Sequence, residues 1–169
     1  MTLREIQRPI KDRYVADPSA ARITLRATGQ TGDGALSCSV DIGRALYAAG
    51  AHQGVGGSGL AACSGDLLLG ALAACAQLTC QMVAENMGLD VRIRVTVEGD
   101  LDLRGTLGTP DVPVGFEAIR IHFDLRPASP IEPDRLARLQ DRTERYCVVL
   151  QTLLAAPAID TQWREEAVA

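Results

Sequence analysis

Residues 66–87 read DLLLGALAACAQLTCQMVAENM, and this stretch decides the fold of the chain. Leu and Ala predominate in it, and both residues favour a helix. Asp66 suits the positive end of a helix dipole, and Gly88 can end the helix in a left-handed conformation. The first half is apolar on every helical face, so we expect it to be buried on all sides. The sequence therefore predicts a central buried helix.

Apolar and polar residues alternate on both sides of this helix, with the period of a β-strand. Two short runs, at residues 22–27 and 35–42, flank the turn sequence TGQTGDG and predict a β-hairpin. Two longer runs, at residues 91–103 and 119–125, follow the helix with a Gly- and Pro-containing loop between them. The Gly-rich segment 43–65 has neither period and is interpreted as a flexible connector.

The last part of the chain predicts a second helix. Pro133 suits a first helical turn, and residues at three- and four-residue spacing continue to Leu154, with a break expected near Cys147. Residues 159–163 are expected to form a short final strand. Residues 1–20 are charged, contain two prolines, and are interpreted as a loose N-terminal arm. The expected organisation is an arm at 1–20 and a single α+β domain at 21–169, with helices against one face of an antiparallel sheet.

Composition narrows the class of protein. The chain has 169 residues and a formal net charge of −4, and its basic residues are scattered, so we expect no nucleic-acid partner. The first residues lack the apolar core of a secretory signal, and the longest apolar run, 67–76, is too short to cross a membrane. We therefore expect a cytoplasmic protein without a membrane partner. A helix this apolar in so small a chain predicts an intertwined homodimer.

Five cysteines are present: Cys38, Cys63, Cys75, Cys80 and Cys147. The odd number and the absence of a CxxC pair argue against a disulfide framework, and the histidines lack zinc-site spacing, so no metal or cofactor is expected. Cys38 is interpreted as a core residue of the hairpin. Cys75 and Cys80 lie about 140° apart around a helix and cannot pair.

Cys75 and Cys147 lie on two different helices, which packing could bring together. This is the one pairing that the pattern suggests. A cysteine inside LAACAQ is, however, commonly a small core residue, so from the residues alone both interpretations stay open.

The ordered set of motifs points to a family. DLLLGALAACAQLT resembles the central-helix motif of the OsmC/Ohr family (osmotically inducible protein C and organic hydroperoxide resistance protein). ERYCVVLQTLL resembles the second cysteine segment of that family, and VEGDLDLRG with GFEAIRIHFDL is similar to its strand pair. The resemblance begins near residue 22. It implies antiparallel sheets packed around two central helices in an intertwined homodimer.

The resemblance also implies an activity. Cys75 would be the peroxidatic thiol and Cys147 the resolving thiol of an enzyme that reduces organic hydroperoxides to alcohols. A sulfenic acid would form on Cys75, Cys147 would convert it to a disulfide, and a dithiol reductant of lipoyl type would restore both thiols. The alternatives are a non-catalytic dimer of this family that binds an apolar small molecule, and an unrelated structural dimer. Cys63 is a second candidate for the resolving thiol.

Three positions depart from the family pattern. The hairpin turn TGQTGDG lacks the usual Arg, Gly65 stands at the position of the usual Glu, and Val148 replaces a common Pro. Asp66 is adjacent to the Glu position. On an ideal helix it lies almost opposite Cys75 and about 13 Å along the axis, so it could act only through a bend or across a dimer. The candidate cations for the thiolate are Arg22, Arg26, Arg44 and Arg145.

Overall fold

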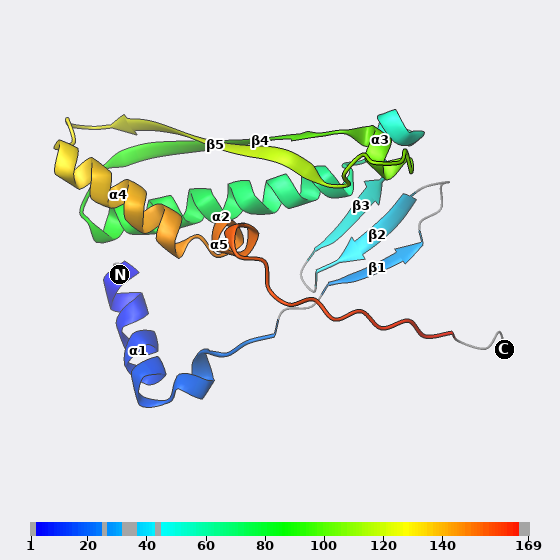
Figure 1. The fold of residues 1–169 in the computed structure, drawn as a ribbon. Helices are drawn as coiled ribbons and strands as arrows, with labels where there is room; N and C mark the ends of the chain where they lie inside the picture. The colour runs from blue at the N-terminus through cyan, green and yellow to red at the C-terminus, as the bar shows by residue number, and fades with distance from the viewer. Residues whose placement is uncertain (1–2, 25–26, 32–36, 43–44, 166–169) are drawn as a thin grey trace.

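The computed structural model describes residues 3–24, 27–31, 37–42 and 45–165 (Figure 1). The elements in chain order are α1 (Leu3–Ala16), η1 (Pro18–Ala21), β1 (Thr28–Thr31), β2 (Ser37–Asp41), β3 (Leu46–Gly50), η2 (Gln53–Val55), α2 (Ser64–Asn86), β4 (Val91–Leu101), α3 (Leu103–Thr106), β5 (Phe116–Pro127), α4 (Pro133–Tyr146) and α5 (Val148–Leu154).

The main body is a helical layer under a two-stranded sheet. The strands β4 and β5 pair antiparallel along their whole length, and α2 runs beneath them with α4 and α5 at its side (Figure 1). Along β4, half-buried apolar residues alternate with exposed polar ones, which is the pattern expected for a sheet with one covered face. The predicted α+β class with antiparallel sheets and helices is confirmed.

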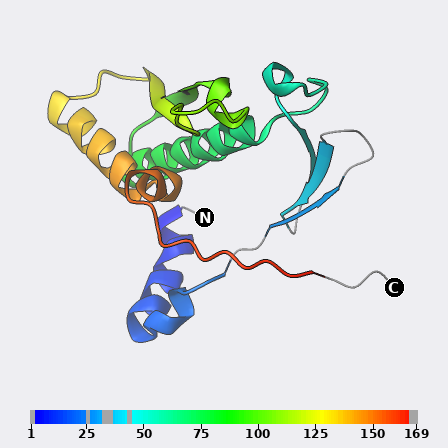
Figure 2. The ribbon, with the colours of Figure 1, turned by 45° about the vertical axis from the view of Figure 1, so that its right-hand side comes forward.

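A second sheet stands apart from this body. The strands β1, β2 and β3 form an antiparallel sheet in that order, beyond the N-terminal end of α2 (Figure 2). Two antiparallel strands are present as predicted, but the first, β1, lies inside the predicted turn TGQTGDG. The strand predicted at residues 22–27 is wrong for the residues of that run that the structure describes. Residues 32–36 and the side chain of Cys38 lie outside the described part of the chain.

The core consists of two clusters on one side of α2. One cluster joins Cys80, Val83 and Ala84 to Leu139 of α4. The other joins Leu72 and Ala76 to Cys147, and the apolar residues of β4 and β5 cover it. The predicted helix boundaries hold to within two residues, and Gly88 follows the helix with a φ of 63°. Gly tolerates this left-handed conformation without the steric cost that a Cβ brings.

Four sequence expectations are wrong in detail. The loose arm contains helix α1, in which Pro9 forgoes one hydrogen bond while the surrounding residues keep the helix. The presumed connector contains β3, because its backbone completes the ladder of β2. Leu103 begins the short helix α3 and does not extend β4. Residues 159–163 form no strand and pair with none of the described strands. The domain boundary after residue 20 stays a prediction.

The burial of α2 is one-sided. The expectation that it is covered on all faces is wrong for the single chain, because Leu68 is 39% exposed, Leu78 59% and Met82 39%. Among the described residues, α2 is the one helix long and apolar enough to cross a membrane, by length and composition only. The core helix of a soluble protein can pass the same test. The test by mean hydropathy accepts some polar residues in the span. An uninterrupted apolar run is a stricter criterion, and the longest such run, residues 67–76, is too short to cross a membrane.

Candidate functional site

The structure brings the thiols of Cys75 and Cys147 together. Cys75 lies in the middle of α2, half-buried, and packs against the cluster that contains Cys147. Cys147 lies between α4 and α5 and is only 1% exposed. The two thiols are neighbours, because each one affects the pKa of the other. Both cysteines are free thiols in this structure.

The predicted break near Cys147 is present and shapes the site. Cys147 has an extended backbone, with φ −73° and ψ 103°, so α4 ends at Tyr146 and α5 starts at Val148. The first hydrogen bond inside α5 runs from Gln151 N–H to the Cys147 carbonyl at 2.9 Å. The preceding N–H groups of α5 therefore lack partners within their own helix and are available to a neighbouring acceptor.

Polar neighbours stabilise the thiolate of Cys75. Burial raises its pKa, but interactions with the Val149 N–H, the Cys147 thiol, the Thr79 hydroxyl and the Val148 N–H outweigh burial and leave the pKa below its ordinary value. A thiolate at the start of a helix is favoured by unpaired N–H groups. Thr79 lies one helical turn after Cys75 on the same face of α2 and is 5% exposed.

The pKa of the second thiol, Cys147, is shifted in the opposite direction. Burial raises the pKa of Cys147, and the neighbouring Cys75 raises it further, while the N–H groups of Leu150 and Val149 act in the other direction. Cys147 thus stays protonated at a pH where Cys75 begins to ionise. The site therefore pairs a more acidic thiol, Cys75, with a less acidic one, Cys147.

The proposed cationic partners do not explain the lowered pKa of Cys75. Among the described residues, its named stabilisers are backbone N–H, thiol and hydroxyl groups. Arg145 instead lies over the ring of Tyr146, 5.7 Å from its centroid. Arg22 caps the end of η1. Arg26 and Arg44 lie outside the described residues.

Asp66 serves the helix and not the same-chain thiol. Its Oδ2 accepts the Cys63 N–H at 2.9 Å, which closes a capping box at the start of α2. The backbone N–H and side chain of Cys63 lower the pKa of Asp66, and His52 adds a smaller effect. The carboxylate is therefore held at the N-terminus of α2, in agreement with the expectation that it cannot reach Cys75 within one chain.

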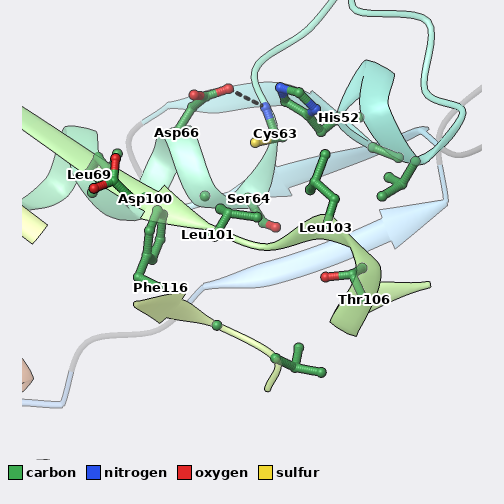
Figure 3. A pocket seen from close by; sticks show the side chains of 17 residues that line it. His52, Cys63, Ser64, Asp66, Leu69, Asp100, Leu101, Leu103, Thr106 and Phe116 are labelled. Atoms are coloured by element: carbon green, nitrogen blue, oxygen red, sulfur yellow. Dashed lines mark hydrogen bonds between the residues drawn. The ribbon is translucent and has the colours of Figure 1, made fainter. Parts of the chain in front are cut away.

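The remaining described cysteines lie elsewhere. Cys80 is in the other core cluster, where burial raises its pKa against the smaller effect of Thr143. Cys63 precedes α2 and lines a pocket of about 700 Å³ (Figure 3). His122 lies on the exposed face of β5, 3.3 Å from Glu98. In the described part of the chain no three His, Cys, Asp or Glu residues are grouped to hold a metal ion.

Sequence reasoning missed the donors around Cys75. The sequence suggested an Arg as the group that stabilises the Cys75 thiolate, whereas the structure supplies main-chain N–H groups from α5 and the hydroxyl of Thr79. A signal for Thr79 was present, because a residue four positions after Cys75 shares its helical face. The N–H donors had no signal beyond the predicted helix break.

Several solved structures have a similar arrangement of helices and strands. An OsmC-like protein from Mycoplasma pneumoniae matches with a TM-score of 0.66 at 16% identity, covering 79% of this chain and 89% of that one. An OsmC-like protein of unknown function from Vibrio cholerae matches with a TM-score of 0.65 at 10% identity, covering 78% and 94%. An organic hydroperoxide resistance protein OsmC from Legionella pneumophila matches with a TM-score of 0.56 at 18% identity, covering 79% and 90%.

These likenesses define the fold as that of OsmC-like proteins. The family model described as OsmC-like protein matches residues 56–162, well over half of the sequence. No curated protein sequence matches the chain. This chain therefore belongs to the OsmC-like family, as a divergent member.

Proposed function

We propose that this protein is a thiol-dependent peroxidase that reduces organic hydroperoxides to alcohols. The Cys75 thiolate attacks the terminal peroxide oxygen, the O–O bond breaks, and the leaving alkoxide takes a proton to become an alcohol. Cys75 is then a sulfenic acid. Cys147 displaces its hydroxyl as water and forms the Cys75–Cys147 disulfide. A dithiol reductant of lipoyl type reduces this disulfide by two exchange steps and becomes a disulfide itself.

The proximity of the Cys75 and Cys147 thiols carries the proposal. A resolving thiol must reach the sulfenic acid while the helix that carries the sulfenic acid stays folded. A disulfide also needs the two Cα atoms within about 7 Å of each other. Cys75 and Cys147 belong to different elements, and they interact in the folded chain. Cys63 and Cys80 have no such relation to Cys75 among the described contacts.

The unequal thiols support the division of roles. A peroxidatic cysteine needs thiolate, and the pKa of Cys75 is lowered; a resolving cysteine attacks only after oxidation and can stay protonated. The lowered pKa compensates in part for the missing Arg and Glu. Names of related proteins point the same way, since one structural neighbour is an organic hydroperoxide resistance protein from Elizabethkingia anophelis.

The protein is proposed to act as a homodimer. One face of α2 carries exposed Leu68, Leu78 and Met82, and a second copy would bury this apolar surface. Reduced, catalytically cycling thiols suit the cytoplasm, where we expect the protein to be located.

Peroxide consumption with dihydrolipoamide as the dithiol tests the proposal. Wild-type protein is expected to consume cumene hydroperoxide catalytically, and Cys75→Ser is expected to abolish turnover. Cys147→Ser is expected to stop turnover while leaving a Cys75 sulfenic acid that dimedone traps. Circular dichroism of each variant verifies folding.

Cys63→Ser is the matched control. Ser is a preferred N-cap residue, so the start of α2 is retained, and turnover is expected to stay within about twofold of wild type. Turnover in Cys75→Ser would contradict the mechanism. Loss of turnover in Cys63→Ser alone, with Cys147→Ser active, would transfer the resolving role to Cys63.

A further inference from the structure

The pocket beside Cys63 is built by backbone and apolar side chains from five segments. The start of α2, the end of β4, α3, the residues before β5 and the segment at η2 enclose about 700 Å³ (Figure 3). Phe116 packs flat against the chain at Gly99, where a Cβ would stand 2.6 Å from its ring. Leu103 packs over Gly54 in the same way, at a place where any Cβ would collide.

A β-bulge shapes one wall. The register of β4 and β5 shifts at Asp100/Leu101, so that Leu101 pairs with Phe116 and Glu117 is the extra residue. Both Leu101 and Phe116 line the pocket. Bulges commonly occur next to binding sites, where they redirect side chains. Volumes of about 300–1,000 Å³ with mostly apolar walls are typical of small-molecule sites.

Three polar groups of the pocket lie close together on one side. His52, Cys63 and Asp66 lie together near the start of α2, across from Leu101 and Phe116 (Figure 3). His52 Nδ1 accepts the Gly54 N–H at 3.0 Å, so a neutral ring carries its proton on Nε2 and can donate from there. An occupant would find an apolar wall and a few hydrogen-bonding groups.

Charge narrows the class of occupant. The pocket contains the carboxylates of Asp66 and Asp100, and neither Lys nor Arg is among its lining residues. The Asp100 carboxylate is paired with Arg120, whereas Asp66 has no Lys or Arg partner among the described contacts. An anionic head group beside Cys63 would therefore face the negative charge of Asp66. We propose that this pocket binds an uncharged apolar small molecule with one hydrogen-bonding group, and that it rejects the corresponding anion. Neither Cys75 nor Cys147 lines the pocket, so the proposal is independent of the peroxidase cycle.

A matched pair of fluorescent probes tests the proposal. N-phenyl-1-naphthylamine is uncharged, and 8-anilinonaphthalene-1-sulfonate carries a sulfonate on the same ring system. The full-length reduced protein is titrated with each probe. Alkylation of Cys63 by iodoacetamide, read by peptide mass spectrometry, then locates the bound probe. The uncharged probe is expected to slow Cys63 alkylation by about fivefold or more, because it covers the thiol, and the sulfonate is expected to leave it unchanged.

Val114→Trp fills the pocket, and Val15→Trp is its control. Val114 lines the pocket and is 73% exposed, while Val15 lies on α1 and is 83% exposed, so each position accepts the larger side chain. Protection of Cys63 is expected in wild type and Val15→Trp and not in Val114→Trp. Equal protection in Val114→Trp, equal protection by the sulfonate, or a Cys63 that is unreactive without any probe would each overturn the proposal. The last result would mean that the protein itself closes the pocket.

Discussion

Cys147 ends α4, begins α5, and places its thiol against that of Cys75 in the middle of α2. This one residue therefore combines two tasks. Its extended backbone interrupts the helix, which leaves the first N–H groups of α5 without intrahelical partners. Its side chain meets the neighbouring sulfur, which those same N–H groups stabilise as a thiolate. The geometry that pairs the thiols also activates one of them.

The pH dependence of Cys75 alkylation is the first prediction. Because its folded pKa is lowered, the rate should rise with pH and reach half its plateau below pH 9.0, the thiol value from which the pKa is lowered. Rates are measured with iodoacetamide from pH 5 to about pH 10 and read for each cysteine by mass spectrometry. Cys147 should reach its midpoint at a higher pH, since its pKa is raised. A Cys75 midpoint at or above that of Cys147 would refute the assignment.

Thr79→Val removes the hydroxyl donor next to the Cys75 sulfur. A hydrogen bond to a charged group contributes about 1.5 kcal/mol, so the Cys75 midpoint should rise by roughly one pH unit. Thr79→Ser keeps the hydroxyl and should restore the wild-type midpoint. Thr96→Val, on the exposed face of β4, is the control and should change nothing. An unchanged midpoint in Thr79→Val would show that the hydroxyl does not act on the thiolate.

Asp66→Ala tests whether this carboxylate caps α2 or serves the thiol. Loss of the cap should lower the free energy of unfolding by about 1 kcal/mol, measured by urea denaturation, with the Cys75 midpoint unchanged. The folded pKa of Asp66 is lowered, so its stabilisation is present above the unfolded pKa of about 3.9 and is lost as pH falls through the folded value. The difference from wild type should therefore shrink below about pH 4. A shifted Cys75 midpoint at unchanged stability would instead indicate action on the thiol across a dimer.

Leu78→Glu tests the homodimer. Leu78 is 59% exposed on α2, and a charge at a buried dimer interface is costly. Sedimentation should give twice the chain mass for wild type and a shift towards the monomer for the variant. Leu107→Glu is the control, because Leu107 is 63% exposed in the loop after α3 and should not affect assembly. A wild-type monomer at micromolar concentration would contradict the proposed assembly.

Periodicity predicted the elements that have a covered and an exposed face. Apolar and polar residues alternate along β4 and β5, and α2 is long and rich in Leu and Ala. The bounds of these three elements were therefore predicted to within a few residues. The strand β3 was missed because its sequence LYAAG lacks alternation, and only pairing with β2 makes it a strand. Residues 159–163 have strand composition but pair with no strand in the described part of the chain. Pairing is a tertiary property that local sequence does not contain.

The sequence predicted the two cysteines of the candidate site but not the groups that surround them. Spacing placed Cys75 and Cys147 on two helices, and the predicted break near Cys147 is confirmed. The stabilisation of the thiolate was not foreseen, because backbone N–H groups carry no side-chain signature. The pocket at Cys63 was not predicted, since its walls come from segments far apart in sequence, and segment 43–65, which supplies part of them, was interpreted as a connector.

Peptide mapping after a single oxidation tests the central claim most directly. The reduced protein is treated with one equivalent of cumene hydroperoxide, the remaining thiols are blocked, and the unreduced digest is analysed by mass spectrometry. The account predicts that a disulfide between Cys75 and Cys147 is the main product, with Cys63 and Cys80 recovered as blocked thiols. Recovery of Cys75 as a blocked thiol, or its linkage mainly to another cysteine, would contradict it.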